Sequence, residues 1–574
     1  MAILSPVAEL LNRIVYMKRA TRTLFLLLSL SLVATPAIAQ DEVLKADWMM
    51  PGPPAGLSSQ GVVFMEPTLY PNSTSYLTSF GIYKAPDNPA LEKRSEHICK
   101  SVNTESCATD NSISYNAYIP VCATSKSRNC IENFWLVLNG KKFQPKLDSY
   151  MPAASPLHFN EDIVANLPEG KSTSIWKIND SELGQSEQLF SVSTVFSGGI
   201  DMSLRKSSKP SISIVIDQIE KISGNYTIPQ ASNTGNGWTI GGCLYEGCGD
   251  DNIGFCAAVD NNRCAKRVNN IEGIRYGIKI RITDPPITWI HGRLLNADFN
   301  SENYSDGVTW SIEAEPVALP VISGWIPNSE VLQKINLTLT SLNAASSWTG
   351  PFSSGEGAIQ QFNKWIPYLG DKAQALQKRW SVGTILSRQI FNGKTLEQCL
   401  SSNEIAGVVM SNATVYQGEP PTWNASDSTL DYKVAAPHYT PSGSEFLGVY
   451  QLKINNKFAR CIYGLQKVPL VATVSIVGND GATRVGISSI SMGSEWINFN
   501  VSGFTFSAPT IKVQLAEAKK ENTIETKVEA QQPSVSSEVL PKVSQKKSIT
   551  CIKGKTTKKV TAVKPACPRG YKKK

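Results

Sequence analysis

The sequence lacks the motifs that anchor the common kinds of catalytic site. Its 574 residues contain no Gly-x-Ser-x-Gly, no His-Glu-x-x-His and no glycine pattern of the Walker or Rossmann type. These motifs supply the nucleophile of serine hydrolases, the ligands of zinc proteases and the phosphate cradle of nucleotide-binding proteins. The usual forms of those three classes are therefore excluded.

Histidine is also scarce, with four residues in the whole chain: His97, His158, His291 and His438. A catalytic histidine needs partners at fixed positions, and a sequence does not give those positions. His291 and Arg293, in the segment TWIHGRL, form the most suggestive pair, although Arg and His beside a strand end commonly serve local structure. For His438 we expect a hydrogen-bonded structural role.

After residue 40 no stretch approaches the roughly 18 consecutive apolar residues of a transmembrane helix. Residues 18–33 combine a basic start with a short apolar run, and the Ala-Ile-Ala that ends at residue 39 has the pattern read by signal peptidase. We therefore expect residues 1–39 to be a signal peptide, with Met17 as the true initiator. The mature chain is expected to have no transmembrane span and to be secreted, extracellular or associated with the cell surface.

Cysteine is plentiful, and its pattern indicates disulfides. The count of twelve is even, the spacings are mostly local, and no Cys-x-x-Cys occurs, which argues against a structural zinc site and a thioredoxin-like motif. Export would place these residues in an oxidising environment. The predicted disulfide-forming residues are Cys99, Cys107, Cys122, Cys130, Cys243, Cys248, Cys256, Cys264, Cys399, Cys461, Cys551 and Cys567.

Residues 40–320 consist of short runs of alternating apolar and polar residues, separated by turn-forming Gly, Pro, Asn and Asp. The clearest predicted strands are Ser211–Ile219, Arg275–Ile282 and Val308–Val317. This N-terminal region is expected to be β-rich, with one or two subdomains.

Residues 321–395 have a different pattern, which predicts a helical insert. Apolar residues recur at helical spacing in Asn328–Leu342 and in Ala358–Trp380, and Pro367 and Gly370 interrupt the second segment. The aromatic residues of that segment are expected to pack against a sheet rather than to line a ligand site.

Alternation returns in six or seven runs over residues 396–515, one of them Phe458–Leu465. That number of short strands is typical of an immunoglobulin-like or other β-sandwich domain. Cys399 and Cys461 are expected to connect two of its strands. The predicted fold class is therefore mainly β, with sandwich domains, a small helical insert, disulfide cross-links, a disordered linker and a short basic tail.

The last residues differ in composition from the rest. Residues 516–548 contain no aromatic residues and are rich in Glu, Lys, Gln, Ser and Pro, a composition that is typical of a disordered linker. Residues 549–574 contain nine cations and no carboxylate, whereas the whole chain has a net charge of +8, so the preceding residues have a net charge of −1.

Charge concentrated in this way predicts that the tail binds an anionic envelope polymer. Nucleic acid fits the charge, but an exported protein is not expected to meet it. The predicted envelope-binding residues are Lys553, Lys555, Lys558, Lys559, Lys564, Arg569, Lys572, Lys573 and Lys574.

The tail also resembles a known signature. The run Cys-x-Lys-Gly-Lys-x-x-Lys-Lys-Val from Cys551, followed by Cys-Pro-x-Gly-Tyr-Lys from Cys567, is similar to the C-terminal end of secreted and surface proteins of actinobacteria. The segments LDYKVAAPHY, ARCIYGL and GFTFSAPTIKVQL resemble the last domain of members of that group. The resemblance covers roughly residues 396–574. It implies an exported actinobacterial protein and carries over no catalytic residues.

One acidic segment has oxygen-bearing residues at alternating positions, as a calcium loop does: Asp298, Asn300, Glu302 and Asp306. It lacks the glycine at the sixth position and the bidentate Glu at the twelfth. We expect a polar turn, keep calcium as the alternative, and predict no other cofactor.

The leading functional prediction is a non-enzymatic protein of the cell surface or wall that binds or builds something there. The alternative is an extracellular hydrolase acting on polysaccharide, with its site in residues 45–395, because a glycosidase needs only two carboxylates at a set separation. A third possibility is a carrier with a large apolar cavity near the helical insert. A cleft with two facing carboxylates would favour the hydrolase. No oligomeric state is predicted.

Overall fold

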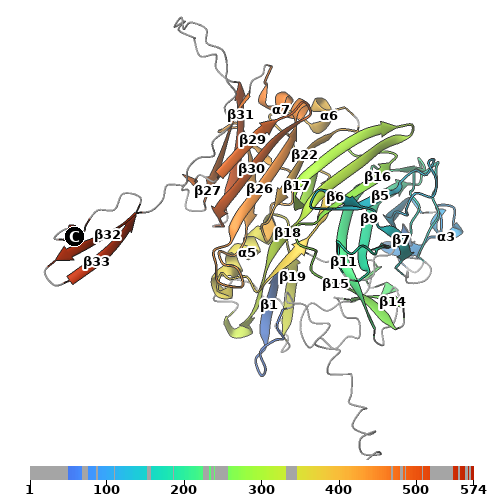
Figure 1. Ribbon diagram of the computed structural model, residues 1–574. Coiled ribbons are helices and arrows are strands. Elements are labelled where there is room, and N and C mark those ends of the chain that lie inside the picture. Colours follow the sequence, from blue (N-terminus) through green and yellow to red (C-terminus); the bar gives the residue numbers. More distant parts are fainter. Residues whose placement is uncertain are drawn as a thin grey trace, which may run out of the picture. The chain divides into compact units, whose positions relative to one another are not determined.

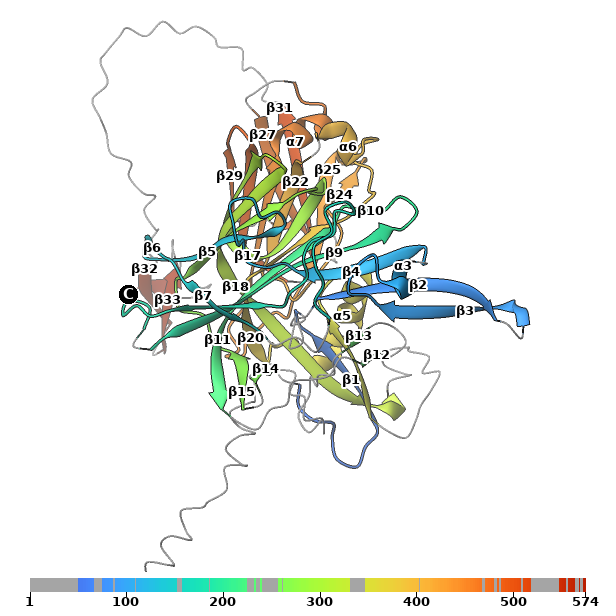
Figure 2. The same ribbon diagram turned by 90° about the vertical axis from the view of Figure 1, so that its right-hand side faces the viewer.

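The computed structural model is mainly β, which confirms the predicted fold class, and its described part contains four helices (Figures 1 and 2). The chain divides into two compact units, residues 1–518 and 519–574. The structure describes residues 50–66, 75–85, 88–108, 110–151, 157–184, 186–223, 232–233, 238–239, 256–260, 262–330, 346–401, 403–466, 470–478, 483–484, 487–506, 509–517, 547–553, 556–562, 567 and 571–573. The predicted signal peptide, Cys243, Cys248 and almost all of the predicted linker lie outside these residues.

Two long strands, β17 (Thr288–Tyr304) and β18 (Gly307–Pro327), form a hairpin at the centre of the larger unit (Figure 1). The first half of β17 pairs with β21 (Ser381–Ile385) and, in parallel, with β22 (Ile405–Ser411), while its second half pairs with β18. Because the two halves of β17 have different neighbours, this strand contributes to both sandwiches of the larger unit, the N-terminal one and the C-terminal one.

The N-terminal end is a two-layer sandwich. One layer follows the antiparallel order β3 (Asn88–Ile98), β2 (Tyr76–Ala85), β4 (Ser112–Tyr118), β9 (Gln188–Asp201) and β11 (Ser211–Ser223). The other contains β6 (Lys141–Phe143), β5 (Cys130–Leu138), β16 (Arg275–Ile282) and β18. In β16 every second side chain, from Tyr276 to Ile282, is fully buried, as the alternation of the sequence predicts. Phe134, Phe190 and Tyr276 meet between the layers at ring distances of 5.8–6.5 Å.

Shorter elements complete this end of the unit. They are α3 (Glu105–Ala108), β7 (Lys146–Tyr150), β8 (Ser174–Ile178), β10 (Lys206–Ser207), β12 (Ser232–Asn233), β13 (Trp238–Thr239), β14 (Cys256–Asp260) and β15 (Arg263–Arg267). The three strands predicted most clearly from alternation all lie within observed strands: β11, β16 and β18.

The C-terminal end is a second sandwich. One layer is β22, β26 (Leu447–Asn455), β30 (Trp496–Thr505) and β29 (Ile487–Met492). The other is a six-stranded sheet of β23 (Val415–Tyr416), β24 (Thr422–Asn424), β25 (Thr429–Ala435), β31 (Thr510–Glu517), β27 (Leu470–Val477) and β28 (Thr483–Arg484). Buried residues of both layers, such as Leu452 and Phe499 on one and Tyr432 and Val513 on the other, share one core.

One predicted strand of this region is wrong. Residues 458–463 lie in helix α7 (Asn456–Tyr463), not in a strand. The Asn455 side chain accepts hydrogen bonds from the backbone N–H of Lys457 and of Phe458, and Gly464 ends the helix in the left-handed conformation with φ 68°. The Cys399–Cys461 disulfide therefore joins two helices, α6 (Leu396–Cys399) and α7, rather than two strands.

The predicted helical insert is only partly helical. Helix α5 (Glu356–Leu369) buries Ile359, Phe362 and Trp365 against β1 (Ser59–Phe64) and β18, so its aromatic residues do form a core contact. The helix stops at Gly370, φ 79°, and the chain continues as β20 (Ala375–Arg379) and β21. β19 (Ser347–Phe352), which pairs in parallel with β1, precedes the helix. The predicted helix at 328–342 lies mostly outside the described residues.

The boundaries predicted at residues 320/321 and 395/396 do not delimit separate units. β18 runs through the first, and the β17–β22 pairing connects segments on either side of the second. Parallel pairing between strands more than a hundred residues apart has no local sequence signal, so alternation alone could not reveal this connection.

Three disulfides are described in full: Cys99–Cys107, Cys122–Cys130 and Cys399–Cys461. Cys264 and Cys567 are disulfide-bonded as well, and no cysteine in the described part of the chain is free. The predicted disulfide cross-linking is thus confirmed for these residues. In the part of the chain that the structure describes, no helix is long and apolar enough to cross a membrane.

The shared position of β17 leads to a prediction about stability. Trp289 of β17 is fully buried in the C-terminal core, with its ring 5.6 Å from that of Phe458 and 6.2 Å from that of Phe391. We expect Trp289→Ala to lower the free energy of unfolding by about 3–5 kcal/mol, because the cavity it leaves would be enclosed by well-packed strands. Urea unfolding of the whole chain measures this.

Leu57→Ala is the control, because Leu57 is 57% exposed and its replacement should change stability by about 0.5 kcal/mol or less. A loss below about 1 kcal/mol for Trp289→Ala would show that β17 is not part of the C-terminal core.

Candidate functional site

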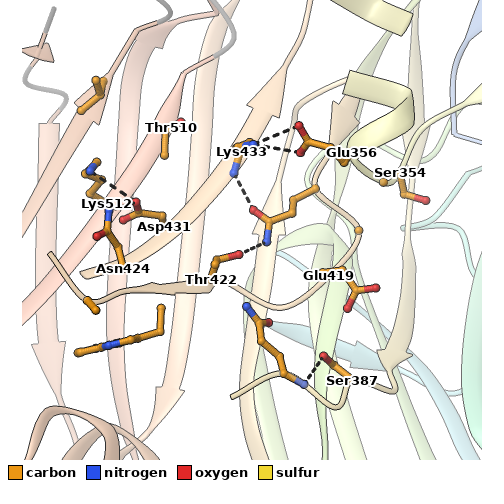
Figure 3. A pocket seen from close by; sticks show the side chains of 17 residues that line it. Ser354, Glu356, Ser387, Glu419, Thr422, Asn424, Asp431, Lys433, Thr510 and Lys512 are labelled. Atoms are coloured by element: carbon orange, nitrogen blue, oxygen red, sulfur yellow. Dashed lines mark hydrogen bonds and ion pairs between the residues drawn. The ribbon is translucent and has the colours of Figure 1, made fainter. Parts of the chain in front are cut away.

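The largest described cavity, about 1190 Å³, opens beside the six-stranded sheet, and we call it the outer cavity (Figure 3). Its walls come from the start of α5, residues 387–389, the loop of residues 417–425 and strands β25 and β31. Polar side chains dominate the lining: Ser354, Glu356, Ser387, Gln389, Gln417, Glu419, Thr422, Asn424, Asp431, Lys433, Thr510 and Lys512. The third functional prediction, a carrier with an apolar cavity near the helical insert, is not what this lining favours.

Two of the three carboxylates in the outer cavity have lysine partners. Both Glu356 carboxylate oxygens accept hydrogen bonds from Lys433 Nζ at 3.1 Å, and Asp431 lies 3.5 Å from Lys512 Nζ (Figure 3). Carboxylates neutralised in this way differ from the facing pair, one of them in an apolar or anionic environment, that glycosidase chemistry requires. The third, Glu419, is exposed at the cavity wall.

Gln417 fixes the loop that closes one side of the outer cavity. It is 8% exposed, its amide donates to the carbonyl of Pro420 at 2.7 Å and to Thr422 Oγ1 at 2.9 Å, and its carbonyl accepts from the backbone N–H of Lys433. Trp423 follows in the short strand β24, with its ring edge-to-face at 5.0 Å from Tyr463. These contacts fix the loop and the strand that follows it.

A second cavity of about 380 Å³, the inner cavity, adjoins the first. It is lined by residues of β11, β17 and β21 and by Glu66, Arg379 and Tyr416. The two cavities adjoin at Gly418, which lines both, and at Leu386 and Ser387, which each line one. Gly418 has φ 81°, and a Cβ there would lie 2.7 Å from the backbone N of Gly355, so only glycine fits at this junction.

His291 lines the inner cavity, and Arg293 lies two residues further along on the same face of β17. His291 is 7% exposed, and its ring stacks on Tyr416 with centroids 3.6 Å apart and planes 6° apart. The Arg293 guanidinium lies over the same tyrosine ring at 4.2 Å and donates to Glu66 Oε2 at 2.7 Å and to the carbonyl of Ala413 at 2.6 Å. Of the pair suggested by the sequence, His291 therefore lines a cavity, and Arg293 contacts Glu66 and Tyr416, which line it as well.

Burial, together with the positive charge of Arg293, holds the pKa of His291 well below its usual value, so the ring is neutral at pH 7. The His291 Nε2 atom is buried and has no hydrogen-bond partner among the described residues. Burial raises the pKa of Tyr416 as well. The inner cavity therefore has an uncharged imidazole with an unused ring nitrogen.

The other histidine considered above has the expected structural role. His438 donates its backbone N–H to Asp371 Oδ1 at 2.9 Å, and its Nδ1 lies 2.5 Å from Asp371 Oδ2. This contact ties the segment before β26 to the end of α5.

The calcium candidates make contacts with other side chains. Asp298 pairs with Arg275 at 2.9 Å, Glu302 lies 3.7 Å from Lys279, and Asn300 donates to Glu302. Asp298, Asn300 and Glu302 lie along β17, and only Asp306 lies in the turn that follows, so the four do not surround a point as loop ligands do. No group of three or more His, Cys, Asp or Glu residues in the described chain could hold a metal ion.

Sequence reasoning missed most of the residues that surround His291. Glu66 is 227 residues away from Arg293 in the sequence, and Tyr416 is on a different strand. One signal was present: the polar loop between two predicted strands contains a lone tryptophan, Trp423, and polar loops on a rigid scaffold are common binding elements.

The buried imidazole leads to a prediction about pH. The pKa of His291 is lower in the folded than in the unfolded chain, so the unfolded chain binds the extra proton as pH falls through about 6.5, and stability is lost. Between that pH and the folded-state pKa, this one group should cost up to about 1.4 kcal/mol per pH unit. His291→Gln, which cannot titrate, should remove this part of the slope, as measured by urea unfolding from pH 7 to pH 5.

The pKa of His158 is lowered too, mainly by desolvation, so the wild-type slope is not due to His291 alone. The difference between wild type and variant isolates His291. Equal slopes would show that the ring is not buried in neutral form.

Comparison with known protein families finds no family that matches this chain, and a search of curated proteins returns no match. The function is therefore inferred from the two cavities and from the basic tail.

Proposed function

We propose that this chain is an exported actinobacterial surface protein of the non-enzymatic, ligand-binding type, retained on an anionic envelope polymer by its basic tail. The observation that carries the proposal is a separate, compact C-terminal unit in which cations lie on every strand. The resemblance of the tail and of residues 396–574 to secreted actinobacterial proteins supports the assignment to that group.

The tail unit is a three-stranded antiparallel sheet. Its central strand, β32 (Lys547–Lys553), pairs with β33 (Thr556–Ala562) on one side and with β34 (Lys572–Lys573) on the other. The register places Cys551 between Lys558 of β33 and Lys573 of β34. Neighbouring strands lie about 4.8 Å apart, so this sheet brings lysines that are distant in sequence close together. Such a dense positive charge attracts a polyanion and gains little from a neutral one.

The disulfides support export. The described cysteines are bonded, and disulfides persist in oxidising compartments outside the cytoplasm. The disulfide at Cys567 gives order to a tail too small to fold by burial alone.

The lining of the outer cavity supports binding rather than hydrolysis. Lys433 and Lys512 neutralise Glu356 and Asp431, and the remaining carboxylate, Glu419, is solvent-exposed. A hydrolase centre would need one carboxylic acid kept protonated and a second free to act as base or nucleophile.

The tail provides the test. We expect replacement of Lys553, Lys558, Lys559, Lys572 and Lys573 by Gln to release the protein from isolated cell walls, because most of the tail's charge is removed. The wild-type protein should sediment with the walls at low salt and elute at about 1 M NaCl, where the screening length is only about 3 Å. Co-sedimentation at the two salt concentrations measures both effects.

Substitution of the same five lysines by Arg keeps the charge and should keep the protein on the walls. Retention of the Gln variant at both salt concentrations, equal to wild type, would refute electrostatic retention.

A further inference from the structure

The outer and inner cavities adjoin at Gly418, which lines both; Trp423 and Asn424 line the outer cavity and His291 lines the inner one, and we call the two together the path. Their volumes of about 1190 and 380 Å³ exceed together that of a cofactor-sized pocket, and at the place where they adjoin Gly418 packs closely on the backbone of Gly355.

Charge along the path is compensated by ion pairs within the protein. Glu356 pairs with Lys433, Asp431 with Lys512, Glu66 with Arg293, and Arg379 with Asp217. A charged ligand gains affinity when it meets an unpaired opposite charge, and displacing an existing partner would cost what the new contact supplies. Among the charged residues described in the two linings, only Glu419 is exposed and has no ion-pair partner there. The path is therefore adapted to an uncharged ligand.

The groups left to recognise such a ligand are hydroxyls and amides. Ser213, Ser381 and Thr384 line the inner cavity, and Ser387, Gln389, Thr422, Asn424 and Thr510 line the outer one. Apolar side chains lie between them: Val215, Val382, Ile385 and Leu386 in the inner cavity, and Trp423, Ala425 and Val477 in the outer one.

His291 has a ring nitrogen that a ligand could satisfy with a hydrogen bond. Its Nε2 atom is buried and unpartnered, and a buried polar atom without a hydrogen bond destabilises the protein. A hydroxyl group can donate or accept, so it satisfies the imidazole whichever ring nitrogen carries the proton. At the other end of the path, the Trp423 Nε1 atom is likewise buried and unpartnered, and its N–H needs an acceptor.

We propose that the two cavities form one binding site for a neutral, hydroxyl-rich oligosaccharide, with one sugar hydroxyl on His291 Nε2 and a second sugar oxygen on Trp423 Nε1. This deepens the proposed ligand-binding function and rests on it. The body of the protein would thus recognise a neutral glycan, while the tail recognises an anionic polymer.

Isothermal titration calorimetry on the full chain tests the proposal, in about 0.5 M NaCl so that the tail is screened. The probes are neutral hexasaccharides of glucose, mannose, galactose or N-acetylglucosamine, each titrated separately, with hexagalacturonate and a neutral hexapeptide for comparison. At least one neutral hexasaccharide should bind, and the other two probes should not. His291→Phe keeps a ring that can stack on Tyr416 but has no nitrogen, and it should weaken binding about tenfold or more. Trp423→Phe, which removes the indole N–H, should weaken it as well.

His158→Phe is the matched control, because His158 lines neither cavity, and it should leave the affinity unchanged. Thermal unfolding of each variant identifies any that fails to fold, and Trp423→Phe, in the short strand β24, keeps the test decisive if His291→Phe does not fold. Binding of no neutral hexasaccharide at millimolar concentration, unchanged affinity in both cavity variants, or binding of the peptide or hexagalacturonate alone would overturn the proposal. Wall retention is measured separately with the tail variants, so failure of one proposal leaves the other result intact.

Discussion

The buried guanidinium of Arg293 is the interaction on which the geometry around the cavities depends. A charge that is 1% exposed must be paired and hydrogen-bonded, and Arg293 meets this need with Glu66, with the carbonyls of Ala413 and Thr414, and with the face of Tyr416. Glu66 follows β1, and residues 413–416 run from the end of β22 into β23, so one side chain ties β17 to two segments that are far apart in the sequence. Tyr416, held in this way, positions His291 by stacking. The inner cavity is thus a consequence of satisfying one buried charge.

The same strand explains why the two sandwiches form one unit. β17 must pair with β21 and β22 in its first half and with β18 in its second, and the register shifts between Leu295 and Asp298. Asn296, with φ 50°, sits at this irregularity, and Gln451 of β26 bonds both its backbone N–H and its side-chain carbonyl. The register shift lets β17 exchange its partners β21 and β22 for β18 within one strand. The hydrogen bond from the Asn296 backbone N–H to Gln451 pairs a polar backbone group at the point of the shift.

Sequence patterns predicted what depends on local spacing and failed where distant contacts decide. Alternation gave β11, β16 and much of β18, because one face of each strand is buried. Alternation also suggested a strand at 458–465, although Asn455 and Gly464 are the capping residues of α7. The pairing of β17 with β22, and the approach of Glu66 to Arg293, join residues more than a hundred positions apart. Of the site, the His291 and Arg293 pair was visible, but its partners were not.

The contrast between body and tail gives the two parts different physical roles. In the body, the charged side chains at the cavities pair with one another, so the groups without a charge partner there are hydroxyls, amides and the ring nitrogens of His291 and Trp423. In the tail, nine cations have no carboxylate nearby in the sequence. Attraction by the tail is long-ranged and falls with salt, whereas hydrogen bonds in an enclosed cavity are short-ranged and depend on geometry. A protein built in this way can concentrate at a charged surface without selecting among its polymers, and can select by shape and hydroxyl pattern only at the cavity, because the two kinds of recognition use different groups.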